Sequence, residues 1–160
     1  MKRAVTGVVI AMGVLILAQL VPYGRNHTNP PIQQEPPWNL AGTRVLTERA
    51  CFDCHSNETK WPWYSNVAPV SWLVQRDVDE GRRALNLSEW NRPQMEGNEA
   101  ARTVEKGEMP PRSYVAVHPE ARLEPSQRDV LIRGLQATVG GANRRSAAIN
   151  VGRQRMGEER

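Results

Sequence analysis

The chain has 160 residues, of which 39% are apolar, and its 21 Lys and Arg against 17 Asp and Glu give a net charge of +4. This length allows one domain and leaves little room for two. Residues 1–23 carry +2 and residues 140–160 carry +3, which leaves −1 for residues 24–139. A nucleic-acid-binding domain has a basic face, so this near-neutral middle argues against nucleic acid as a partner. Two cysteines allow at most one disulfide, which excludes a disulfide-rich scaffold.

The first predicted element is an apolar helix at the N-terminus. Lys2 and Arg3 precede an uncharged, mostly apolar run over residues 4–23. At about 1.5 Å per residue this run would be about 30 Å long, which is the thickness of a bilayer hydrocarbon core. We therefore expect residues 1–23 to form a single-pass transmembrane signal anchor in the cytoplasmic membrane, with the remainder on the periplasmic side. A cleaved signal peptide is the alternative, although the run lacks a good Ala-x-Ala site.

Three segments follow the apolar run. Residues 24–38 contain two Pro-Pro pairs, which predict an extended, semi-rigid spacer. Residues 39–139 are expected to form the folded domain. Residues 140–160 are rich in Arg, Asn, Ser and Gly, which predicts a disordered polar tail.

The domain is predicted to be all-α, because helical signals recur in it and the alternation typical of strands is absent. Capping residues, prolines and glycines set the expected ends of the helices. Five short helices are expected: one beginning near Thr43, one from Val70 to Gly81, one beginning at Ser88, one from Asn98 to Lys106, and one from Ser126 to about Val139.

Both cysteines lie in one motif, Cys51-Phe52-Asp53-Cys54-His55. Cys-x-x-Cys-His is the attachment sequence of a c-type haem. Two thiols must reach two vinyl groups on one porphyrin edge, and the histidine that follows must turn its imidazole onto the iron. On a helix, residues at i, i+3 and i+4 share one face. The motif therefore predicts one covalent haem c, with thioether bonds to Cys51 and Cys54 and with His55 as the proximal iron ligand.

Other interpretations of the cysteine pair stay open. A structural zinc site needs four ligands, and beyond the cysteines only His27, His55 and His118 are available, without His-x3–5-His spacing. A thioredoxin-like redox pair needs a βαβ context, which the sequence does not indicate. A plain disulfide would leave the adjacent histidine unexplained. The haem interpretation is favoured.

A low-spin cytochrome needs a second axial ligand, which is commonly Met or His. Met109 is the leading candidate, because Pro110 and Pro111 would hold its sulfur on a rigid loop. His118, which precedes a proline, is the rival candidate for the distal position.

Four aromatic residues follow the motif closely. Large rings beside a haem would supply buried area that the chain otherwise lacks. The residues expected to pack on the haem are Trp61, Trp63, Tyr64 and Trp72.

The His55 ring N–H also needs an acceptor. The carbonyl oxygen that accepts from it is expected in the Pro62 or Pro69 loop.

The motif and the stretches after it, among them Gly107-Glu108-Met109-Pro110-Pro111, resemble the bacterial haem-binding domain family of small periplasmic or membrane-anchored proteins. The resemblance runs in the family's order over roughly residues 38–137. It implies one covalent c-type haem, a mostly helical cytochrome c-like fold and residence on the outer side of the cytoplasmic membrane. The family's Met-Pro falls on Met109-Pro110, which implies Met109 as distal ligand. The stretches that carry the resemblance are residues 51–73, 77–82, 87–90, 107–111 and 118–123.

The expected function is electron transfer by a monohaem c-type cytochrome in the periplasm, with the iron held by His55 and Met109. The alternative is a haem-based sensor or binding module with an exchangeable distal ligand. An enzyme such as a peroxidase is not expected, because the chain has no second Cys-x-x-Cys-His and no obvious distal acid–base histidine unless His118 serves. No catalytic residue is assigned, and the redox partner proteins are not indicated.

Overall fold

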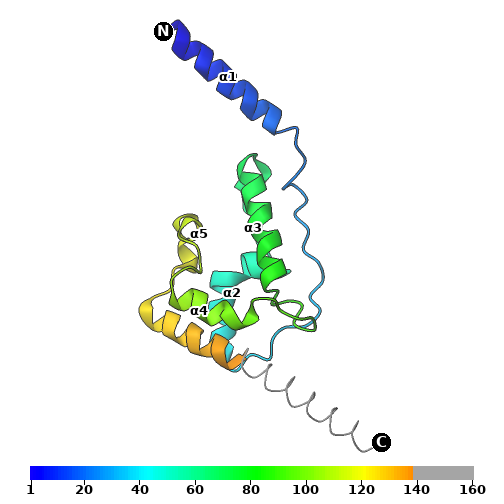
Figure 1. Ribbon diagram of the computed structural model, residues 1–160, viewed down its shortest axis with the longest axis vertical. Coiled ribbons are helices and arrows are strands. Elements are labelled where there is room, and N and C mark those ends of the chain that lie inside the picture. Colours follow the sequence, from blue (N-terminus) through cyan, green and yellow to red (C-terminus); the bar gives the residue numbers. More distant parts are fainter. Residues whose placement is uncertain (139–160) are drawn as a thin grey trace, which may run out of the picture.

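The computed structural model describes residues 1–138, and its regular elements are all helices (Figure 1). In the described part the only β pairing is an isolated bridge between Gln34 and Glu89. The prediction of an all-α domain is therefore confirmed. The α-helices are α1 (Lys2–Ala18), α2 (Ala41–His55), α3 (Val70–Ala84), α4 (Ala100–Glu105) and α5 (Arg112–Val117), and residues 125–138 are also helical. The 3-10 helices are η1 (Trp63–Asn66), η2 (Gly97–Glu99) and η3 (Pro119–Ala121).

The N-terminal helix α1 is shorter than predicted. It has 17 residues, which corresponds to about 25 Å at 1.5 Å per residue, less than a bilayer core of about 30 Å. The chain leaves the helix at Gln19, whose side chain bonds both the carbonyl oxygen and the N–H of Ala68, at 2.9 and 3.1 Å. Within residues 1–138 no helix is long and apolar enough to cross a membrane. The predicted transmembrane helix over residues 1–23 is not supported.

Helices α2 and α3 pack closely against each other. Gly81 was expected to end the second helix of the domain, but α3 continues through it to Ala84. A Cβ atom at Gly81 would overlap the Cys54 carbonyl oxygen and lie 2.9 Å from the Cys54 carbonyl carbon. The glycine therefore serves a close contact between two helices and not a helix end.

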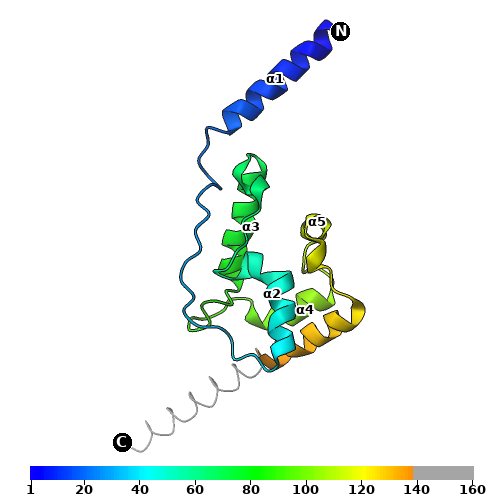
Figure 2. The ribbon, with the colours of Figure 1, turned by 180° about the vertical axis from the view of Figure 1, so that it is seen from behind.

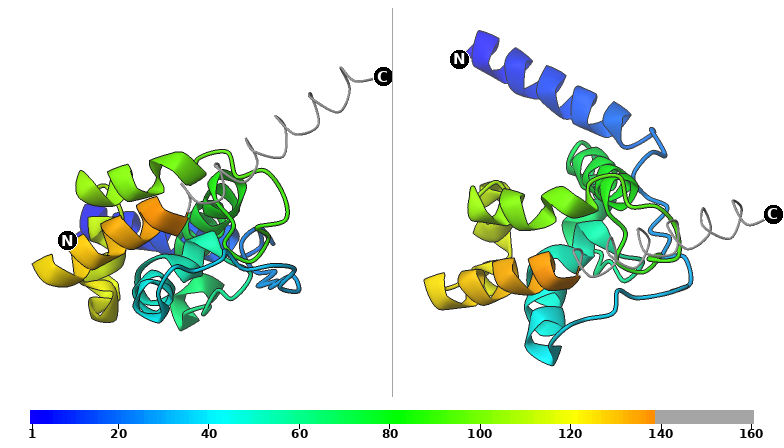
Figure 3. Two further views of the ribbon diagram at one scale, coloured as in Figure 1. Left: turned by 90° about the horizontal axis from the view of Figure 1, so that it is seen from below. Right: turned by 60° about the horizontal axis from the view of Figure 1, so that its bottom comes forward.

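Helix α4 and the helix at residues 125–138 lie side by side (Figure 3). Their buried apolar residues form one cluster, and Arg128 donates to the Val104 carbonyl oxygen from both Nε and a terminal nitrogen, at 3.0 and 2.8 Å. The helices predicted near residues 98–106 and from Ser126 are confirmed. The buried members of this cluster, called the α4 cluster below, are Ala101, Val104, Leu131 and Leu135.

A second apolar cluster joins the end of α2 to the chain after α3. It contains Phe52, Leu85 and Leu87, with Trp38 and Trp90 packed against it, and we call it the α2 cluster. The helix predicted to begin at Ser88 does not form there, and the chain makes turns instead.

Polar side chains in this region bond the backbone in competition with a helix. The Ser88 hydroxyl accepts from the N–H of Asn57, and Asn86 donates its side-chain amide to Asn57 at 2.9 Å. Asn86 Oδ1 accepts from the N–H of Ser88. These bonds hold the turn at Asn86 and Ser88 against the chain that directly follows α2.

Residues 24–38, predicted as a spacer, instead run along the domain as a strap (Figure 2). His27 stacks on Trp61 with ring centroids 4.6 Å apart. The N–H groups of Gln33 and Gln34 both donate to the Ser88 carbonyl oxygen. Arg82 of α3 donates to the Thr28 carbonyl oxygen and to the Asn29 side chain, and also to Ser56 and Thr59. The strap is therefore part of the folded domain. The predicted tail at residues 140–160 lies outside the described residues, as does Val139.

Candidate functional site

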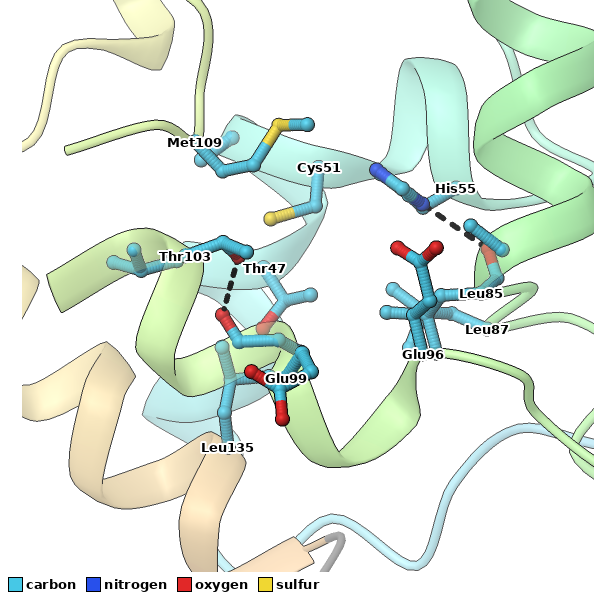
Figure 4. A pocket seen from close by; sticks show the side chains of 14 residues that line it. Thr47, Cys51, His55, Leu85, Leu87, Glu96, Glu99, Thr103, Met109 and Leu135 are labelled. Atoms are coloured by element: carbon cyan, nitrogen blue, oxygen red, sulfur yellow. Dashed lines mark hydrogen bonds between the residues drawn. The ribbon is translucent and has the colours of Figure 1, made fainter. Parts of the chain in front are cut away.

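A cleft lies between the α2 cluster and the α4 cluster (Figure 4). The space between its atoms amounts to about 590 Å³, including the part that opens to solvent. Most of its lining is apolar, and its polar members are Thr47, His55, Glu96, Glu99 and Thr103. The apolar residues that line it include Ala50, Ala84, Leu85, Leu87, Val104 and Leu135.

His55, the last residue of α2, lines this cleft. Its Nδ1 lies 3.0 Å from the Gly81 carbonyl oxygen and 3.1 Å from the Leu85 carbonyl oxygen. Because both neighbours are acceptors, Nδ1 carries the proton and the lone pair is left on Nε2. Burial lowers the pKa of His55, although the two carbonyls act in the opposite direction. The imidazole is therefore neutral at pH 7 and oriented as a metal ligand.

The acceptors of the His55 proton differ from those predicted. They are Gly81 in the last turn of α3 and Leu85 directly after it, and not the loops at Pro62 and Pro69. Gly81 brings α3 against α2, so its carbonyl oxygen reaches the imidazole. An amphipathic helix after the motif was visible in the sequence, but the residue that faces His55 depends on how the two helices cross. No local pattern gives that crossing.

Both cysteines are free thiols. Cys51 lines the cleft, whereas Cys54 packs against Gly81 and is absent from the cleft lining. Burial raises the pKa of each thiol to about 12, so both are protonated at neutral pH. The structure thus places one thiol in the cleft and the second one turn along the same helix.

Met109 also reaches into the cleft, from the loop between α4 and α5 (Figure 4). Its side chain is 37% exposed, so it stands at the cleft mouth. The cleft therefore holds a thiol, a neutral imidazole with a free Nε2 and a thioether sulfur, between apolar walls. This donor set fits a haem: nitrogen and sulfur are the axial donors of cytochromes c, and the walls suit a flat apolar ring.

The rival ligand His118 lies outside the cleft lining. Its Nε2 lies 2.7 Å from the Tyr64 hydroxyl, and its Nδ1 lies 3.0 Å from Glu120 Oε1. Both ring nitrogens are already engaged in hydrogen bonds, so binding iron would break one of them. The arrangement favours Met109 over His118.

The four aromatic residues expected to pack on a haem do not line the cleft either. Trp61 stacks on the strap residue His27, and Trp63 is 79% exposed. Tyr64 bonds His118, and Trp72 lies in the first turn of α3. These residues follow α2 in sequence, but η1 and the start of α3 lead the chain away from the cleft. Aliphatic residues form its walls instead.

Comparison with curated proteins and with solved structures gave no match. Comparison with protein families gave a match to the haem-binding domain over residues 13–137. This range includes the strap and nearly every element that borders the cleft. The chain belongs to the haem-binding domain family.

Proposed function

We propose that the chain is a monohaem c-type cytochrome that transfers electrons. In this proposal Cys51 and Cys54 form thioether bonds to one haem, His55 is the proximal iron ligand and Met109 is the distal one. The observation that carries the proposal is the His55 imidazole, whose Nδ1–H is held by two carbonyl oxygens while Nε2 is left for a metal in a cleft shared with Cys51 and Met109.

When bound, a haem would supply a one-electron couple between ferrous and ferric iron. The Gly81 and Leu85 carbonyl oxygens hold the imidazole in one tautomer and make it a stronger donor. The aliphatic walls exclude water and lower the local dielectric. Glu96, near His55, favours positive charge in the cleft. The folded part is close to neutral, so partner exchange should depend only modestly on salt.

Met109 also supports a second candidate function. Its 37% exposure and its place at the cleft mouth would let an external ligand compete for the distal position. This would make the protein a haem-based sensor or binding module. Rapid binding of carbon monoxide to the ferrous form, in place of the Met109 sulfur, would favour this candidate.

We also propose that the domain acts outside the cytoplasm. Lys2 and Arg3 followed by the apolar helix α1 form the pattern of an export signal. Cell fractionation, together with mass spectrometry of the native N-terminus, tests this proposal. Recovery of the protein in the cytoplasm would contradict it.

The decisive experiment is a test for covalent haem. The full chain is produced together with c-type maturation machinery, and a denaturing gel is stained for haem. We expect stain at the mass of the chain, and its loss in the Cys51→Ala, Cys54→Ala double variant. A chain without haem whose two cysteines form a disulfide would overturn the proposal.

The distal ligand is tested by comparing Met109→Ala with Met95→Ala. Met95 is 76% exposed and does not line the cleft, so it is a matched control. Low-spin ferric protein with Met–iron ligation shows a weak red charge-transfer band. We expect Met109→Ala to lose this band and Met95→Ala to keep it. Retention of the band in Met109→Ala would exclude Met109 as the ligand.

A further inference from the structure

The segment that carries Met109 connects α4 to α5, and its first part is fixed by α4. Gly107 turns the chain with a φ of +73°. The N–H groups of Glu108 and Met109 then both donate to the Thr103 carbonyl oxygen, at 2.9 and 3.2 Å. The backbone on the α4 side of Met109 is therefore held in place.

The part after Met109 lacks comparable support from apolar packing, because α5 has no buried residue. It is joined to α2 by Tyr114, whose hydroxyl donates to Asp53 Oδ2 at 2.6 Å. Asp53 stands between the two cysteines of the motif. Its other carboxylate oxygen accepts from the Lys60 N–H at 2.9 Å, which fixes the carboxylate. One hydrogen bond thus ties the Met109 segment to the attachment motif.

The Tyr114 ring is itself held by a neighbour. It stacks on His118, with ring centroids 4.3 Å apart and an angle of 17° between the rings. His118 is fixed at both nitrogens, by Tyr64 and by Glu120. The Tyr114 hydroxyl is therefore aimed at Asp53 before any ligand binds, and burial and Asp53 raise the pKa of Tyr114, which keeps the donor protonated.

We propose that Tyr114 is a positioning residue for the distal iron ligand. Its hydrogen bond to Asp53 latches α5 onto the attachment motif and holds the Met109 sulfur in the cleft. This inference rests on the proposed function, because the latch affects iron only if Met109 is an axial ligand. Without the latch the sulfur leaves the iron more often, and an external ligand binds faster. A hydrogen bond to a charged group is worth about a tenfold change or more in such an equilibrium.

The test compares Tyr114→Phe with Tyr64→Phe in the full-length, haem-loaded protein. Each variant removes one tyrosine hydroxyl, but the Tyr64 hydroxyl bonds His118 and not Asp53. We expect carbon monoxide to bind the ferrous Tyr114→Phe protein about tenfold faster than the wild type, with a weaker Met–iron charge-transfer band. Tyr64→Phe leaves the Tyr114–Asp53 bond in place and loosens only the His118 ring on which Tyr114 stacks, so its rate and band should change much less than those of Tyr114→Phe.

Hydrogen exchange gives a second readout that does not need haem. Residues 109–117 should exchange faster in Tyr114→Phe than in the wild type, whichever form of the full-length protein is purified. Asp53→Ala removes the same bond from the other side, so the double variant should add little to either single one. Asp53→Ala also replaces Tyr114→Phe if the latter fails to fold.

Unchanged carbon monoxide binding and unchanged exchange in Tyr114→Phe would overturn the latch. Additive effects in the double variant would overturn it as well. Absence of covalent haem from the wild-type protein would overturn the proposed function instead, and hydrogen exchange would then decide whether Tyr114 holds α5.

Discussion

Replacing Gly81 with alanine is expected to destabilise the domain, although alanine favours helices. A Cβ atom at this position would overlap the Cys54 carbonyl oxygen and lie 3.0 Å from the Cys54 Cβ. Unstrained heavy atoms stand about 3.5 Å apart, so α2 and α3 must separate by about half an ångström or more. Overpacking of this kind costs about 1–3 kcal/mol. Alanine in place of glycine within a helix returns about 1 kcal/mol, so a net loss of up to about 2 kcal/mol is expected.

Gly42→Ala is the matched control for this change. Gly42 lies in the first turn of α2, and a Cβ atom there would meet nothing within 4 Å. It should therefore leave the free energy of unfolding unchanged or raise it. Urea unfolding followed by circular dichroism gives the midpoint of each variant, and a loss of up to about 2 kcal/mol lowers it by up to about 1 M. Equal urea midpoints for Gly81→Ala and Gly42→Ala would refute the packing argument. Unchanged hydrogen bonds of the His55 imidazole in the haem-loaded Gly81→Ala protein would refute it as well.

Three further changes test other parts of the structure. Arg82→Lys should lower the free energy of unfolding by about 2 kcal/mol, because an ammonium cannot bond all four acceptors of the guanidinium; a wild-type urea midpoint would contradict this. The Arg44 guanidinium lowers the pKa of Glu35 below its ordinary 4.5, so Glu35→Gln should cost about 1 kcal/mol at pH 7. Since the folded-state pKa is the lower one, this difference should vanish as the pH falls from 4.5 through that pKa, and a constant difference down to pH 2 would disprove the assignment. Leu87→Ala, which opens a cavity in the cleft wall, should cost about 2–5 kcal/mol and reduce haem loading, whereas Trp63→Ala should change neither quantity when both are measured on the same preparations.

The Cys-x-x-Cys-His motif and its helix could be predicted from local sequence, because residues at i, i+3 and i+4 share one face of a helix. Cys51, Cys54 and His55 do lie at the end of one helix. Met109 could be singled out because two prolines follow it, and it does enter the cleft. The last helix was also visible, since Leu131 and Leu135 repeat at helical spacing and become buried together.

Other features depend on contacts between distant segments. Pro-Pro pairs predict extended backbone, but they do not show whether that backbone is solvated or, as in the strap, bonded to Ser88. The aromatic residues after the motif were expected near a haem because they are close in sequence. The turn of the chain at η1 carries them elsewhere, and Trp63 remains 79% exposed. Capping patterns at Ser88 predicted a helix, but Asn57 and Asn86 provide competing partners that only the tertiary fold brings together.

The position of the cleft suggests what a haem would do for the stability of this fold. Leu87 on one side belongs to the α2 cluster, against which Cys51 also packs. Val104 and Leu135 on the other side belong to the α4 cluster, and Ala100 packs against both clusters. A haem in the cleft would join these two small clusters into one core, in a chain with a single phenylalanine. If its bonds to the cysteines are covalent, the haem stays attached when the chain unfolds. Its contribution to the free energy of unfolding then resembles that of a large buried side chain. This contribution does not depend on the concentration of free haem, whereas the contribution of a reversibly bound ligand does. Destabilised variants of the covalent protein should therefore gain nothing from added haem.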